Sequence, residues 1–306
     1  MIEVIATAES TAQAEALLKA GIDTLYVGEE MFGLRLPTSF SVEEIAEIKA
    51  LARAYDKKVI VAVNAIFHND RIEKVRPYLE ELTKIGVDAI TVGDPGVIQI
   101  MKKHDIDLPF IYDAHTLVTS ARQINFWKKR GAIGAVLARE LTYEELVQIR
   151  QQVDIPLEVL VYGATCIHQS LRPLATNYFS FTNQNVEPNK ERYLFLSEAK
   201  DPETHYSIFE DINGTHIFAT DDVSLMPHLH ELVAANLVHW KLDGIFTKGE
   251  RFVEIAKLFV TAKEAFMNDS WSDDLMEQLN EKLHALHPPE RSLSPGFFTM
   301  DPDEVK

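Results

Sequence analysis

Short apolar runs alternate with amphipathic stretches along the first 165 residues of the chain. Seven runs have the length and the β-branched content of buried strands, and we expect strands at residues 2–6, 23–27, 58–63, 88–92, 109–112, 133–137 and 157–161. Apolar residues at helical spacing fill the stretches between them. Strands that alternate with helices in this way predict a parallel sheet covered by helices.

The expected helices carry recognisable boundary signals. Ser41, with Glu44 three residues later, is typical of a capping box at the start of a helix. Gly21 and Gly86 each follow a helical stretch, where a residue in the left-handed conformation commonly ends a helix. An aspartate and then a strand follow each glycine, so this repeated order favours consecutive βα units.

An eighth unit follows after a long interval, with a strand expected at residues 238–242 and a helix at residues 249–267. Eight such units favour a closed TIM-type (β/α)8 barrel over an open sheet. Between the seventh and eighth strands, residues 165–222 contain short β-like pieces, and Asn213-Gly214 is typical of a hairpin turn. We therefore expect a small β-rich insertion on the C-terminal face of the barrel.

The last segment is acidic and differs in pattern from the barrel. We expect one helix at residues 273–286, a stop at Pro288-Pro289 and an extended end around Gly296. This predicts an α/β barrel at residues 1–268 and a C-terminal helix and tail at residues 269–306.

The charge balance excludes some functions. The formal net charge is −17, from 30 basic and 47 acidic residues, and contacts to phosphate need clustered Lys and Arg. An autonomous nucleic-acid-binding domain is therefore not expected. The chain has no run of eighteen apolar residues and no signal-peptide pattern, which predicts a cytoplasmic protein that does not enter a membrane.

Polar side chains follow most of the expected strands. The carboxyl ends of barrel strands converge on one mouth, where the active sites of this fold lie. Arginine and lysine there suit a small anionic ligand such as a carboxylate or phosphate. Our candidate ligand-binding residues are Glu9, Arg35, Asn64, Asp94, Arg139, Glu140, Lys241 and Asp243.

Residues 158–173, EVLVYGATCIHQSLRP, contain the single cysteine of the chain, Cys166. We interpret this stretch as a strand that breaks at Gly163 and enters a turn crowded with polar side chains. Cys166 is a candidate catalytic nucleophile, with His168, His115 or a helix N-terminus just after it as the activating group. The alternative is that Cys166 is a half-buried, small hydrophobic residue. No metal-binding motif or other familiar catalytic signature is present.

The same stretch resembles the signature of the collagenase-like peptidases of family U-32. Four signature positions are matched, by Glu158, Gly163, Ala164 and Cys166. Tyr162 replaces the usual histidine, and Pro173 stands at the position of a second cysteine. Other blocks that resemble the family include KKVIVAVNAIFHND and HWKLDGIF, so that the resemblance covers roughly residues 2–268.

The resemblance implies functions beyond proteolysis. Many bacterial members are regarded as RNA or ubiquinone hydroxylation factors. Several of them carry four cysteines that hold an iron–sulfur cluster, and the RNA-modifying members use prephenate as a co-substrate. This chain has only Cys166, so it is not expected to hold such a cluster. It resembles the shorter, cysteine-poor member of a Gram-positive pair associated with 5-hydroxyuridine at the tRNA wobble position.

That resemblance implies a longer, cysteine-complete partner, contact with tRNA only indirectly or through the complex, and a small anionic co-substrate such as prephenate. Three functions remain open. The leading hypothesis is a subunit or accessory factor of a tRNA-hydroxylating system. The second is a collagenase-like peptidase, a hydrolase that uses Cys166. The third is a non-catalytic scaffold for the longer family member. The sequence leaves both homo- and hetero-oligomers open.

Overall fold

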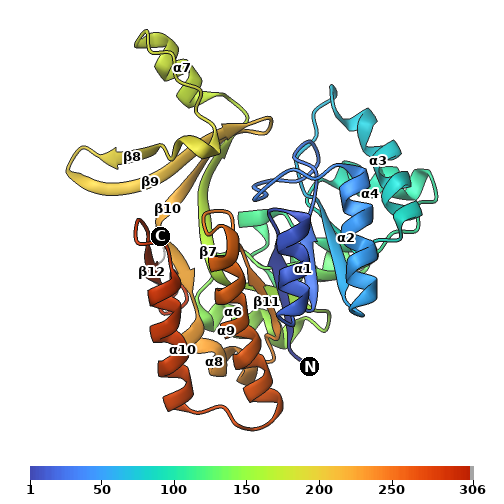
Figure 1. Ribbon diagram of the computed structural model, residues 1–306. Coiled ribbons are helices and arrows are strands. Elements are labelled where there is room, and N and C mark those ends of the chain that lie inside the picture. Colours follow the sequence, from blue (N-terminus) through green and yellow to red (C-terminus); the bar gives the residue numbers. More distant parts are fainter. Residues whose placement is uncertain (304–306) are drawn as a thin grey trace.

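The computed structural model describes residues 1–303 and shows an eight-stranded parallel barrel (Figure 1). Each barrel strand pairs with the next, and β11 pairs with both β1 and β7, which closes the ring. The predicted TIM-type barrel is therefore confirmed. Its strands are β1 (Glu3–Thr7), β2 (Thr24–Val27), β3 (Lys58–Val63), β4 (Ala89–Val92), β5 (Phe110–Tyr112), β6 (Ala132–Val136), β7 (Leu157–Ser170) and β11 (His239–Leu242).

Helices cover the outside of the barrel, and the expected boundary signals shape them. Ser41 and Glu44 form the capping box that starts α2, and Gly86 ends α3 with φ 72°. The covering helices are α1 (Thr11–Lys19), α2 (Val42–Ala54), α3 (Ile72–Ile85), α4 (Pro95–Lys103), α5 (Ala121–Lys128), α6 (Tyr143–Gln152), α8 (Leu229–Ala234) and α9 (Gly249–Met267). Short 3-10 turns occupy His115–Leu117, Lys190–Arg192 and Met226–His228. No helix among the described residues has the length and apolar character needed to cross a membrane.

The alternation of side chains along each strand separates two apolar regions. On β1, Val4 and Ala6 face the large core between strands and helices, whereas Ile5 belongs to a small cluster inside the barrel with Ile60 and Ala89. Polar residues replace the apolar ones toward the carboxyl ends of the strands. The barrel interior therefore holds a small apolar cluster beneath a polar mouth.

β7 is longer than the sequence predicts, because β10 (Gly214–Ser224) pairs antiparallel with its second half. The expected break at Gly163 is wrong. Gly163 adopts φ +124° within the strand, and an added Cβ would lie 2.4 Å from the backbone oxygen of Asp243. The next helix, α7 (Leu174–Phe181), begins well beyond Cys166. Activation of Cys166 by a helix N-terminus just after it is therefore also wrong.

The insertion forms an arm, which we define as residues 165–222. It contains α7, β8 (Phe195–Glu198), β9 (Asp201–Asp211) and most of β10. The expected hairpin at Asn213-Gly214 joins β9 to β10, whereas α7 was not predicted from the sequence. Figure 1 shows the arm projecting beyond the ring of helices, with α7 at its tip.

The C-terminal segment packs alongside the barrel. α10 (Asp273–Leu286) has its predicted bounds, and β12 (Ser292–Ser294) pairs in parallel with β10. Residues 296–299 form a turn, so the predicted extended end around Gly296 is wrong. His287 Nδ1 lies 2.8 Å from the hydroxyl of Tyr162 on β7. The division of the chain at residue 268 stays a prediction.

A candidate active site at the barrel mouth

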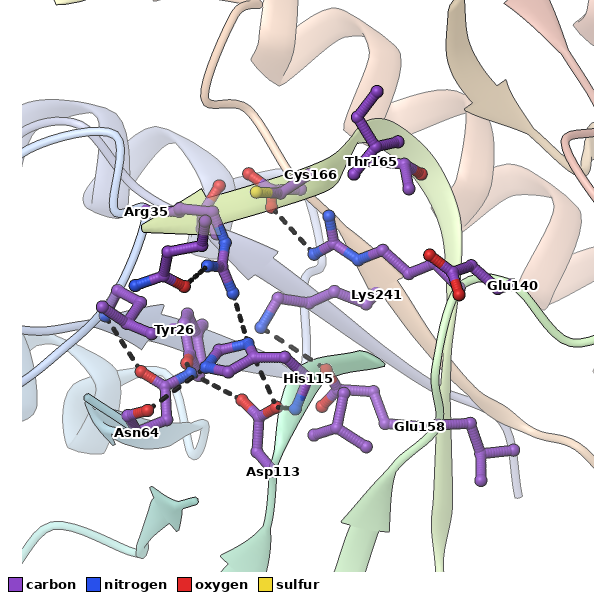
Figure 2. A pocket seen from close by; sticks show the side chains of 18 of the residues that line it. Tyr26, Arg35, Asn64, Asp113, His115, Glu140, Glu158, Thr165, Cys166 and Lys241 are labelled. Carbon is purple, nitrogen blue, oxygen red and sulfur yellow. Dashed lines mark hydrogen bonds and ion pairs between the residues drawn. The ribbon is translucent and has the colours of Figure 1, made fainter. Parts of the chain in front are cut away.

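A cavity of about 210 Å³ opens at the carboxyl ends of the barrel strands, and the root of the arm forms one wall. Loops after β2, β3, β5 and β6 supply much of its polar lining, together with residues on β7 and β11 (Figure 2). It brings together nine of the eleven predicted site residues, namely Arg35, Asn64, His115, Arg139, Glu140, Cys166, His168, Lys241 and Asp243.

The other two predicted residues, Glu9 and Asp94, lie outside the cavity lining. Glu9 accepts a hydrogen bond from the backbone N–H of Gly249 at the start of α9, over 2.7 Å. Asp94 is the N-cap of α4 and accepts from the backbone N–H of Gly96 (2.7 Å) and of Phe67 (2.9 Å). Both carboxylates therefore satisfy backbone donors near helix starts, which is a common structural use of acidic residues after a strand.

Asn64 organises the floor of the cavity. Its side-chain oxygen accepts from the backbone N–H of Leu34 (2.9 Å), which fixes the orientation of the amide. The amide nitrogen donates to Asp113 (2.6 Å) and to the hydroxyl of Tyr26 (3.2 Å). Burial raises the pKa of Asp113, but nearby His115, the Asn64 hydrogen bond and Arg35 bring it below its ordinary value.

His115 lies between Arg35 and Asp113 (Figure 2). Arg35 donates to its Nδ1, and its Nε2 lies 3.2 Å from the backbone oxygen of Asn64. The neutral ring therefore carries its hydrogen on Nε2. Burial and the charge of Arg35 lower the pKa of His115 to about 4. At neutral pH the lone pair on Nδ1 accepts the hydrogen bond from Arg35 and is not available to take a proton. His115 is therefore poorly suited to act as the base that activates Cys166.

Arg35 is the cation best placed to meet an anionic ligand. Its guanidinium donates to Gln169 (2.7 Å) and to neutral His115. The other two cations of the cavity already have carboxylate partners: Arg139 pairs with Asp243 at 3.3 Å, and Lys241 pairs with Glu158 at 3.6 Å. Within residues 1–303, no such ion pair involves Arg35.

Lys241 and Glu158 form a buried pair on neighbouring strands, β11 and β7. Lys241 Nζ also lies 3.2 Å from the centre of the Tyr26 ring. Burial lowers the pKa of Lys241 and raises that of Glu158, and each partner opposes the shift of the other. Arg139 and Lys241 were expected to bind the anion. Because both cations are already paired with carboxylates, Arg35 is the residue best suited to bind an anion. Glu140 contributes an acidic side chain to the cavity lining.

Cys166 is half-buried in the cavity wall, and its thiol donates to the backbone oxygen of His168 over 3.2 Å. His168 is itself exposed. The histidine whose side chain influences the thiol is His216 on β10, which sequence reasoning missed. Its Nε2 lies 2.9 Å from Asp211 Oδ1. The one sequence feature that could have pointed to His216 is the hairpin at Asn213-Gly214. It starts the strand β10, which pairs with the end of β7 that carries Cys166.

Cys166 and His216 each shift the pKa of the other toward its charged form. Burial raises the pKa of the Cys166 thiol, but His216, Arg35 and Arg139 outweigh it, and the pKa falls below its ordinary value. Burial lowers the pKa of His216, whereas Asp211 and the neighbouring thiol raise it, and the net shift is upward. Both shifts favour a thiolate beside an imidazolium.

Comparison with known proteins places this chain in a family. The sequence model of peptidase family U32 matches residues 9–306. The chain belongs to peptidase family U32. The tRNA hydroxylation protein P2 of Bacillus subtilis (strain 168) is 35% identical to it over 300 residues, which are 97% of either chain. Protein P1 of the same bacterium is 29% identical over 303 residues, which cover 98% of this chain and 71% of P1.

Other relatives are more distant. A 23S rRNA 5-hydroxycytidine synthase of Escherichia coli (strain K12) is 26% identical over 247 residues, which cover 79% of this chain and 36% of the synthase. The solved structure of the U32 peptidase Mk0906 superposes with a TM-score of 0.51 at 16% identity, over 79% of this chain and 92% of that one. This likeness supports the barrel fold.

Proposed function

We propose that this U32 protein is a subunit or accessory factor of a system that forms 5-hydroxyuridine at the tRNA wobble position. The relationship to P2 along nearly the whole of both chains supports this assignment. Two further relatives carry names that refer to RNA hydroxylation, P1 and the rRNA 5-hydroxycytidine synthase. A role in RNA hydroxylation therefore accounts for these relationships better than proteolysis does.

The cavity is proposed to bind a small anionic co-substrate such as prephenate. The observation that carries this proposal is Arg35, a guanidinium at the cavity wall that neutral groups hold in place. Arginine suits carboxylates because its planar fork donates two parallel hydrogen bonds. A cavity of about 210 Å³ is smaller than the roughly 300–1,000 Å³ of sites for drug-sized ligands. It therefore suits a metabolite better than a nucleotide.

A longer U32 member is proposed as the partner, and it would supply any iron–sulfur cluster. One cysteine cannot provide four thiolate ligands, and Pro173, at the position of the second family cysteine, is the N-cap of α7. Relatives P1 and P2 occur in one bacterium, which supports such a pair. The net charge of −17 also suits a companion better than an independent tRNA-binding protein.

The arm is the proposed contact with this partner. Exposed large apolar side chains concentrate on it, and α7 buries only Ala175. Tyr178 and Phe181 on α7 are 60% and 87% exposed. Clustered exposed apolar residues are typical of protein–protein contact sites.

The test is genetic and chemical. The gene is deleted in its host, and tRNA nucleosides are quantified by mass spectrometry after complementation. We expect 5-hydroxyuridine and its derivatives to disappear on deletion and to return with the wild-type protein. Arg35→Gln should fail to restore them, whereas Arg76→Gln, a change on the surface of α3, should succeed. Unchanged nucleosides in the deletion strain would contradict the proposal.

A thiol-dependent peptidase is the second candidate function, because Cys166, His216 and Asp211 supply a nucleophile, a base and an orienting carboxylate. Purified protein is incubated with gelatin and a peptide library, with and without divalent metal ions. Cleavage that disappears in Cys166→Ala would support this candidate, and no cleavage under any condition would remove it.

A further inference from the structure

Cys166 lies at the cavity wall with the side chain of His216 as a neighbour, and His216 in turn pairs with Asp211. His216 is fully buried, and its Nε2 lies 2.9 Å from Asp211 Oδ1. The neutral ring therefore carries its hydrogen on Nε2, which leaves the Nδ1 lone pair available. Among the described residues, Nδ1 has no hydrogen-bond partner. A buried ring nitrogen without a partner is uncommon in folded proteins, and this one belongs to the histidine beside the only thiol of the chain.

The pairing of β7 with β10 creates this arrangement. His216 lies opposite Gln169, and Phe218 lies opposite Cys166. The register shifts between them, so that Ile167 has no partner on β10. Such a bulge re-aims the side chains on either side of it, and bulges are frequent beside active sites. Cys166 and Gln169 consequently both line the cavity.

The charged groups around Cys166 come from several elements. Arg35 lies in the loop after β2 and Arg139 in the loop after β6, while His216 and its partner Asp211 come from the arm. Figure 2 shows Arg35 and Cys166 in the lining of the same cavity, and the charge of Arg35 is near enough to lower the pKa of the thiol. A ligand carboxylate on Arg35 would therefore bring the neighbouring atoms of that ligand close to the sulfur.

We propose that Cys166 is a nucleophile, activated by His216 and Asp211, that adds reversibly to the carbonyl group of a small 2-oxo carboxylate held by Arg35. The thiol first turns away from the backbone oxygen of His168, and its proton moves to His216 Nδ1. The sulfur then forms a bond to the carbonyl carbon, and the π electrons of the carbonyl move to its oxygen. That oxygen takes the proton back from Nδ1 and becomes a hydroxyl, which gives a thiohemiketal that keeps its carboxylate charge and needs no oxidant or second reactant.

The 2-oxo carboxylates fit because their two reactive features are one bond apart. The carboxylate meets the guanidinium, which leaves the adjacent electrophilic carbon for the sulfur. The inference stands apart from RNA hydroxylation, because it concerns the chemistry of the cavity alone. A deletion strain with normal tRNA would leave it intact.

The first test measures how reactive the thiol is as a function of pH. Cys166 is the only cysteine, so intact-mass analysis of the iodoacetamide-treated protein reports on this thiol alone. Half-maximal reactivity of the wild-type protein is expected below the ordinary thiol value of about 8.5. His216→Gln should move the midpoint back toward that value, and so should Asp211→Asn, which keeps the shape of the side chain.

His230→Gln, an exposed change on α8, is the matched control and should leave the profile unchanged. Circular dichroism of each variant separates unfolding from a change in reactivity. The same profile for wild type, His216→Gln and Asp211→Asn would overturn the proposal. A shift caused by His168→Gln in place of His216→Gln would overturn it as well.

The second test detects the adduct with pyruvate labelled with ¹³C at the carbonyl carbon. With wild-type protein, a new NMR signal is expected in the region of a saturated carbon bonded to oxygen and sulfur, and Cys166→Ala should abolish it. Pyruvate should protect the thiol from iodoacetamide at concentrations at least tenfold lower than lactate, which has the same charge but no carbonyl group. Arg35→Gln should raise the protective concentration of pyruvate about tenfold. Equal protection by lactate without a new signal would show anion binding only and would overturn the covalent step.

Discussion

Arg35 donates a hydrogen bond to His115 across the cavity, and both residues hold a left-handed backbone conformation, with φ of 54° and 55°. This conformation costs a residue other than glycine roughly 1–2 kcal/mol. The free energy of unfolding of His115→Gly should therefore be about 1 kcal/mol higher than that of His115→Ala, because glycine adopts this conformation without strain. Urea denaturation of the two variants measures the difference. Equal stabilities would show that the loop relaxes without cost.

The lowered pKa of His115 makes stability depend on pH. Its pKa is about 4 in the folded protein and about 6.5 in an unfolded chain. The unfolded chain therefore binds the proton more tightly than the folded protein does. The stability that the folded protein gains from keeping His115 neutral is complete above pH 6.5 and is lost as the pH falls toward 4. Between pH 7.5 and 5, it should remove about 2 kcal/mol from the free energy of unfolding. His115→Gln should show a correspondingly smaller decrease over that interval in urea denaturation.

Gly163 should tolerate no side chain. Its φ is +124°, and a Cβ would lie 2.4 Å from the backbone oxygen of Asp243. Gly163→Ala should lower the free energy of unfolding by more than about 3 kcal/mol, because backbone atoms must move apart. Gly249→Ala is the control, since it has φ +65° with no atom within 4 Å and should cost only about 1 kcal/mol of backbone strain. Equal losses in both variants would contradict the close approach of β7 to β11.

The buried Lys241–Glu158 pair should show strong coupling. Lys241→Met leaves a carboxylate buried without its cation, and losing one partner of such a pair costs about 3–5 kcal/mol. The double variant Lys241→Met/Glu158→Gln should be less destabilised than the sum of the two single variants. Denaturant unfolding of all four proteins completes a double-mutant cycle. Additive losses would mean that the two charges do not interact.

The arm should contribute to association and little to folding. Replacing Tyr178 and Phe181 together by serine should change the free energy of unfolding by less than about 1 kcal/mol, because both side chains are exposed. The same variant should lose co-purification with the longer U32 member of its host. Met267→Ser, an exposed change at the end of α9, is the control and should retain it. If the double variant loses only self-association, the contact joins two copies of this chain.

The barrel could be predicted because its strands and helices carry local signals. β-branched runs, capping residues and the glycines after α1 and α3 act within a few residues of one another, so eight βα units could be predicted from local patterns. The extension of β7 could not be predicted in this way. Its second half is a strand because β10 pairs with it, and a glycine such as Gly163 fits both a break and a bend in a continuing strand.

The candidate site shows the same limit. Polar residues at strand ends predicted most of the cavity, but the pattern could not separate Arg35, which is free of carboxylates among the described residues, from Arg139 and Lys241, which are paired. It also could not show that Glu9 and Asp94 serve helix starts. His216 escaped because its position beside Cys166 depends on a register between strands about fifty residues apart.

The C-terminal segment ties the arm to the barrel. Arg291 donates to Asp222 (2.8 Å), to Ser207 (2.7 Å) and to the backbone oxygen of Ala219 (2.8 Å), which lie on β10 and β9. Within the same segment, His287 meets Tyr162 on the outer face of β7. The tail therefore acts as a brace between two parts of the molecule. Because Arg291 holds β9 and β10 while His287 holds β7, the C-terminal segment fixes the base of the arm relative to the strand that carries Cys166.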